Sequence, residues 1–266
     1  MGVEKSRGIV LRVVEFSESS SVVTLFTEDF GKIGALAKGA KRPKGPFEGA
    51  LDLLSLVRIV FLHKSSDALD LLTEAKLERR FRAAQRDLSR LYAGYYVAEL
   101  LSELTENGDP HPQLFTAADA ALLALDQDAS IAETVLRFEL VALREAGHAP
   151  SLEQCVVCGR PVSTDKRVAF GMTSGGVLCD ECRPGRRGVV SVSGGVIAAL
   201  VAVTNEEPES QRTENRLNNA IAGELRAVMG NYLAHLIGHK LRLSSYLGEP
   251  KLSSGSRERA SGRPIT

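Results

Sequence analysis

The chain has 266 residues, 44% of them hydrophobic and 25% charged, and its 33 basic side chains balance 33 acidic ones. This length suits two or three packed units, and the neutral total by itself predicts no polyanionic partner. No apolar run approaches the ~18 residues that span a bilayer, so we expect a cytoplasmic protein with no membrane partner.

The first part of the chain, residues 1–80, consists of short β-branched runs separated by turn residues. Apolar side chains recur at spacing two, which predicts strands around 9–14, 23–25 and 33–37, and longer apolar runs at 51–62 and 68–75 supply two more. Five short strands suit a small closed barrel, because closure removes exposed sheet edges. An OB-fold is our first expectation and an SH3-like barrel the second.

After Glu78 the apolar period becomes that of helices. A capping pair, Ser130 with Glu133, and a stop at Gly147 mark both ends of one helix. We expect a helical domain built from residues 81–153 and 189–247, followed by a disordered tail at 248–266. The predicted helices run from 88 to a turn at 107–110, and over 114–125, 130–147, 194–203 and 215–237.

Four cysteines, Cys155, Cys158, Cys179 and Cys182, form two C-x2-C pairs separated by twenty residues. Two such pairs can point four thiolates at one tetrahedral Zn2+ ion and leave no position for water, which is typical of a structural site. Two disulfides or a redox pair are the alternatives, although a cytosolic setting keeps thiols reduced. We expect residues 154–188 to form an irregular zinc-binding segment that the metal holds in place.

A basic cluster lies after the third predicted strand. The segment 31–46 holds five cations and no anion, namely Lys32, Lys38, Lys41, Arg42 and Lys44. Cations flanked by glycine suit contacts with DNA phosphates, while a solvated surface loop is the plain alternative.

Aromatic residues that could stack on bases are few in the barrel region, and the chain has no tryptophan. Phe26 and Phe61 are expected in the core, and Phe30 and Phe47, in turns, at the surface. Phe16 is the remaining phenylalanine there.

A second group of cations surrounds the cysteines, and either an extended nucleic-acid surface or an ordinary charged surface explains it. Its members are Arg160, Lys166, Arg167, Arg183, Arg186 and Arg187. The chain has no G-x4-G-K-S/T loop and no G-x-S-x-G sequence, so we expect no enzymatic activity.

The sequence resembles the RecO family of bacterial DNA-repair and recombination mediators. The resemblance spans about residues 6–247 and rests on segments near Gly8-Ile9-Val10-Leu11-Arg12, Ala37-Lys38-Gly39-Ala40-Lys41-Arg42 and His148-Ala149-Pro150, the last running into the first cysteine pair. It implies an N-terminal OB-fold, a helical domain with an inserted zinc knuckle, and binding to single- and double-stranded DNA. It also implies strand annealing and work with RecR and the single-strand-binding protein to place RecA on DNA, in the cytoplasm at the nucleoid.

Taken together, these features predict an α+β protein that acts by binding. A protein-binding helical scaffold with an incidental basic loop is one rival. A zinc enzyme is the other, and the four thiolates disfavour it because they fill the metal's coordination positions.

Overall fold

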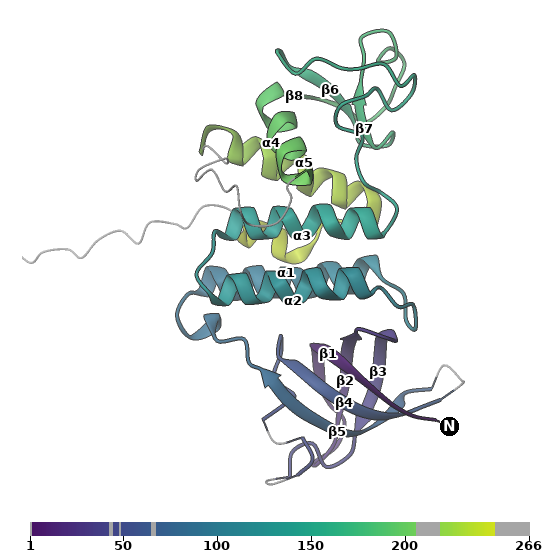
Figure 1. Ribbon diagram of the computed structural model, residues 1–266, viewed down its shortest axis with the longest axis vertical. Coiled ribbons are helices and arrows are strands. Elements are labelled where there is room, and N and C mark those ends of the chain that lie inside the picture. The colour runs from purple at the N-terminus through teal and green to yellow at the C-terminus, as the bar shows by residue number, and fades with distance from the viewer. Residues whose placement is uncertain (1, 43–44, 48, 65–67, 206–218, 248–266) are drawn as a thin grey trace, which may run out of the picture.

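The computed structural model describes residues 2–42, 45–47, 49–64, 68–205 and 219–247, and has a barrel at one end, helices in the middle and a small sheet at the other end (Figure 1). The tail predicted at 248–266 lies outside the described residues. No helix in the described part of the chain is long and apolar enough to cross a membrane.

Five strands close into a barrel in the order β1-β2-β3-β5-β4, with β3 parallel to β5 and the other pairs antiparallel. This agrees with the five-stranded Greek-key barrel of the OB-fold. The strands are β1 Gly2–Glu15, β2 Ser21–Thr27, β3 Gly31–Ala37, β4 Leu56–His63 and β5 Asp70–Arg79. The fourth strand begins later than its apolar run, because residues 52–54 form a bend and a turn.

The barrel has its own core, made by the inward side of the alternating strands. In β3, Ile33, Ala35 and Ala37 are at most 4% exposed, while the residues between them are half-buried. Gly31 permits the turn before β3, because its φ of 63° is in the left-handed region and a side chain there would collide with the backbone of Asp109.

The helices begin and end close to the predicted positions. Asp87 caps α1 by accepting a hydrogen bond from Ser89 N, and Ser130 caps α3 by accepting one from Glu133 N. The helices are α1 Leu88–Leu104, α2 Pro112–Asp126, α3 Ile131–Glu145, α4 Gly194–Thr204 and α5 Asn219–Ile237, with short 3-10 turns η1 Ala83–Gln85 and η2 Arg242–Tyr246. The predicted start of the last helix, residues 215–218, lies outside the described part.

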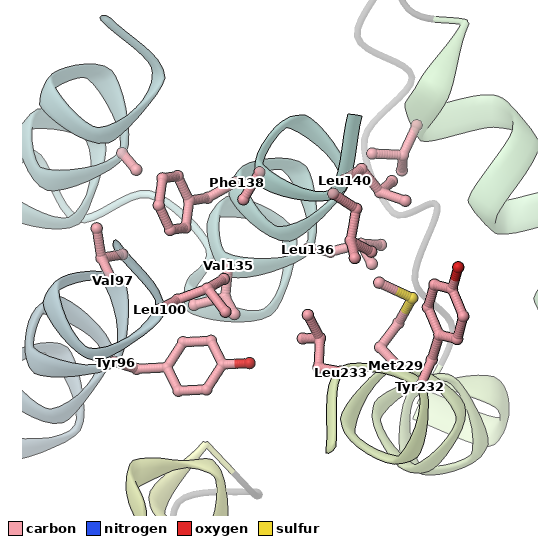
Figure 2. Packing of buried hydrophobic residues seen from close by; sticks show 14 of the residues in the cluster. Tyr96, Val97, Leu100, Val135, Leu136, Phe138, Leu140, Met229, Tyr232 and Leu233 are labelled. Atoms are coloured by element: carbon pink, nitrogen blue, oxygen red, sulfur yellow. The ribbon is translucent and has the colours of Figure 1, made fainter. Parts of the chain in front are cut away.

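One large hydrophobic core joins the helices to the barrel on one side and to the small sheet on the other. Figure 2 shows side chains of α1, α3 and α5 converging, among them Leu100, Leu136 and Leu233, all fully buried. The same core takes in Phe26 of the barrel, whose ring lies 6.3 Å from that of Phe115 in α2. The barrel is thus docked on the helices by apolar packing.

A buried ion pair lies inside the helical part. The carboxylate of Glu139 in α3 is 0% exposed and accepts hydrogen bonds from Tyr96 of α1 and Arg226 of α5. Burial raises the pKa of Tyr96 above its usual value, so this hydroxyl remains a donor. Together, Glu139, Arg226 and Tyr96 link three helices that are distant in sequence.

Candidate metal centre and nucleic-acid interface

The cysteine-containing segment is more regular than the sequence indicates. Strands β6 Val168–Gly171, β7 Gly176–Leu178 and β8 Val189–Val192 form a three-stranded antiparallel sheet in the order β7-β6-β8. The expectation of an irregular segment at 154–188 was therefore wrong in part: β6 and β7 lie within it, and β8 follows it in residues assigned to the helical domain. Runs of three or four residues between glycines are too short to show a clear period.

This sheet is also part of the main core. Phe170 of β6 is 1% exposed and packs edge-on against Tyr232 of α5, with ring centroids 5.7 Å apart. The Tyr232 hydroxyl donates a hydrogen bond of 2.9 Å to His148 O, just before the first cysteine pair. The segment is consequently held by the helical core as well as by its cysteines.

Each cysteine pair lies on a tight turn. In the first, Gly159 has a φ of 72° and its N–H donates to Cys155 O at 2.8 Å. In the second, the N–H groups of Cys182 and Arg183 both donate to Cys179 O at 3.1 Å. Such turns bring the two thiols of a C-x2-C pair close together.

The four thiols meet at one point between the turns. Their Sγ atoms all lie within 4.8 Å of one another, and those of Cys158 and Cys179 are 3.7 Å apart. A tetrahedral ion bound to four sulfurs at ~2.3 Å separates them by roughly 3.8 Å, whereas a disulfide requires about 2.05 Å. All four cysteines are free, so the cluster could hold a metal ion.

The thiols differ in their readiness to ionise. Burial opposes the charge on Cys155, but N–H groups of Cys179, Cys158 and Val157 outweigh it and lower the pKa of Cys155 to about 6. Hydrogen bonds with Cys179 and Cys158 raise the pKa of Cys182 to about 12. The thiolate is the form that binds a metal ion, and a cation bound between the four sulfurs would favour the thiolate at every position.

At the opposite end, three of the five predicted DNA-binding cations lie together. Lys38, Lys41 and Arg42 are exposed in the segment that follows β3, residues 38–42, which we call the rim loop. Lys41 Nζ pairs with Glu15 Oε1 at 2.9 Å, while Lys38 and Arg42 have no carboxylate partner among the described residues. Lys44 lies outside the described part of the chain.

Lys32 is placed differently. Its Nζ donates hydrogen bonds of 2.6 Å to the carbonyls of Ser102 and Thr105, at the end of α1. Desolvation outweighs the nearby Glu103 and Glu106 and lowers the pKa of Lys32. This ammonium therefore fastens β3 to α1.

The cations around the cysteines are partly neutralised. Arg160 pairs with Glu181 at 2.6 Å, and Arg167 pairs with Glu224 of α5 at 2.8 Å. In the part of the chain that the structure describes, no carboxylate pairs with the exposed arginines that follow the last cysteine, which are Arg183, Arg186 and Arg187.

The barrel phenylalanines divide unevenly between core and surface. Phe26 and Phe61 are fully buried, as predicted. The prediction for Phe47 was wrong: it is 3% exposed, because the turn from Phe47 to Ala50 folds its ring into the barrel core. Phe30 is half-buried against Phe61, and Phe16 is 65% exposed.

Comparison with known proteins accounts for nearly the whole chain. Residues 1–81 match the family model "Recombination protein O N terminal", and residues 85–245 match "Recombination protein O C terminal". A protein of Rhodopirellula baltica named DNA repair protein RecO is 42% identical over 268 aligned residues, covering 92% of this chain and 99% of the relative. Proteins of the same name from Anaeromyxobacter sp. strain K and Myxococcus xanthus are 35% and 30% identical, covering 92% and 91% of this chain and 96% and 95% of the relatives.

The barrel, the helices and the cysteine cluster thus lie in a sequence that matches both halves of one family at high coverage. The chain belongs to the RecO family of DNA-repair and recombination proteins.

Proposed function

We propose that this protein binds single- and double-stranded DNA, anneals complementary strands and helps to load RecA during recombinational repair. The main support for DNA binding is the exposed rim loop, which presents Lys38, Lys41 and Arg42 on an OB-type barrel in a chain of the RecO family. Lys44 extends the same run of cations in the sequence. Lys32 contributes to the barrel–helix interface instead.

The rim loop would act through charge and geometry. Two complementary strands repel each other through their phosphates, and cations that neutralise phosphates reduce this repulsion while leaving the base edges free to pair. Such annealing breaks no covalent bond and uses no nucleotide. The protein is accordingly proposed to be a mediator and not an enzyme.

The cysteine cluster is proposed to hold one structural Zn2+. Four thiolates suit this ion, and they leave no coordination position for a substrate. X-ray absorption at the zinc edge of the purified protein should show sulfur ligands only. A nitrogen or oxygen ligand would contradict the closed site.

The proposed partners are DNA, RecR and the single-strand-binding protein, and RecA is an indirect partner. We propose that the protein acts in the cytoplasm, at the nucleoid. The support for these partners is the membership in the RecO family.

The central test is annealing without ATP. The protein should accelerate pairing of two complementary oligonucleotides, one carrying a fluorescent donor and the other an acceptor, and added salt should slow the accelerated reaction. Filter binding to single-stranded DNA at two salt concentrations separates this function from a protein-binding scaffold. Absence of both DNA binding and acceleration would overturn the proposal.

A further inference from the structure

Phe16 is a large aromatic side chain that the fold holds in solvent. It follows the last residue of β1 and is 65% exposed, the highest value among the exposed large hydrophobic residues of the described chain. The turn that carries it is well defined: the N–H groups of Phe16 and Ser17 donate to Ser20 O at 3.0 and 3.1 Å, and Ser20 N donates to Ser17 Oγ at 3.2 Å. The ring is therefore displayed on a structured turn.

The rim loop lies directly beside this turn. Lys41 N donates a hydrogen bond of 3.2 Å to Ser19 O, and Lys41 Nζ pairs with Glu15, the residue before Phe16. The exposed ring and the cations thus lie at the same end of the barrel, and one backbone hydrogen bond and one ion pair connect the two turns.

A partly open strip of sheet leads away from the ring. Val14, Val22 and Leu36 are cross-strand neighbours on the outer side of β1, β2 and β3, and none of them is buried. Farther along this side, Phe26 is buried against α2 and Lys32 bonds to α1, so the helices cover that end of the strip. The open part is the part next to Phe16.

We propose that Phe16 is a stacking site for an unpaired base of single-stranded DNA whose phosphates contact the rim loop. This deepens the proposed function and rests on it. Aromatic rings beside basic grooves bind single strands by stacking, which accepts any base because every base has a π-face. Duplex bases are already stacked on one another, so Phe16 adds affinity for single strands over duplex.

The test uses the absence of tryptophan from this chain. Phe16→Trp introduces a single tryptophan, whose fluorescence should be quenched by an oligo-dT strand and much less by an abasic strand of equal length. Tyr246→Trp, on η2 of the helical part, is the matched reporter control, since Tyr246 is aromatic and 51% exposed. Its fluorescence should respond equally weakly to both strands.

Phe16→Ala should bind oligo-dT about tenfold more weakly than the original protein, as expected for one lost stacking contact. Its affinity for the abasic strand, the salt dependence of binding and its thermal unfolding should stay unchanged. Equal affinity of Phe16→Ala and the original protein for oligo-dT would overturn the stacking site. An equal loss of affinity for oligo-dT and for the abasic strand would also overturn the stacking site. Failure of the original protein to bind either strand would instead overturn the proposed function.

Discussion

The two ends of the molecule both carry exposed cations, but the fold holds them in different ways. The barrel has a separate core of its own strands; Ala40 of the rim loop packs against this core, while the charged residues Lys38, Lys41 and Arg42 are exposed. The cysteine end has only a small cluster around Cys155, Ala169 and Leu178, and otherwise shares the core of the helices. Charges of the rim loop can therefore change without unfolding the barrel, whereas the cysteine end depends on its small four-cysteine cluster and on the helical core together.

The largest expected effect is on the cysteine end. Cys155→Ser removes the most buried thiol of the proposed zinc site, so the variant should not retain zinc and should lose more than about 3 kcal/mol of stability, because metal binding and folding of such sites are coupled. Thermal unfolding and zinc content measure both effects. DNA binding should fall only in proportion to the unfolded fraction. A folded variant that has lost DNA binding would make the cysteine end a direct contact.

The second-largest loss of stability is expected at the buried ion pair between Glu139 and Arg226 in the middle of the molecule. Arg226→Met leaves the carboxylate of Glu139 buried without its cation and should cost about 3 to 5 kcal/mol, because an uncompensated buried charge is strongly destabilising. Urea unfolding of the variant and of the original protein measures this difference in the free energy of unfolding. The double variant Glu139→Gln with Arg226→Met should recover much of the loss; a double variant no more stable than the single one would show that Arg226 acts by packing instead.

The rim loop should affect binding and not stability. Changing Lys38, Lys41 and Arg42 to glutamate should weaken single-strand binding and reduce the slope of log K against log salt by about 2, since each neutralised phosphate contributes ~0.7. Fluorescence anisotropy at several salt concentrations measures this slope. The unfolding temperature should remain close to that of the original protein.

The matched control reverses three charges at the other end. Changing Arg183, Arg186 and Arg187 to glutamate alters the net charge by the same amount, so any general electrostatic effect is equal in the two variants. The control should keep most of its DNA affinity. An equally large loss would extend the DNA surface to the cysteine end.

The smallest effect concerns the connection of the cysteine end to α5. Glu224 accepts hydrogen bonds from Ser193 N and Arg167, and the pKa of Glu224 is lowered first by the Ser193 side chain and then by these two bonds. Because the folded-state pKa lies below the unfolded one, this stability is present above pH 4.5 and is lost as pH falls through the folded pKa. Glu224→Gln should cost about 1 kcal/mol at pH 7 and less at acid pH. Equal losses at pH 7 and pH 3 would contradict this role.

Regular patterns explain which parts of the fold could be predicted. Alternation in β3 and the capping residues of α3 are local signals, and both elements formed as expected. The cysteine spacing likewise predicted four thiols that could share one ion, since two short turns suffice to present them.

Other features depend on contacts between distant residues. Phe47 and Phe16 both lie near turn residues in the sequence, yet one fills the barrel core and the other is in solvent. The strands β6, β7 and β8 are too short to be periodic and are stabilised by packing against α5. Lys32 belongs to a basic run in the sequence, but its partners are carbonyls some seventy residues away.

The sequence by itself determined the barrel strands, the helices and the grouping of the four cysteines, because these depend on local period and spacing, and its motif segments carried the resemblance to the RecO family. Tertiary structure alone decided which cations remain free, since that depends on carboxylates and carbonyls contributed by other elements, as Glu15 and α1 show for Lys41 and Lys32. It also placed Phe16 beside the rim loop, because the closing of the barrel brings these two turns together.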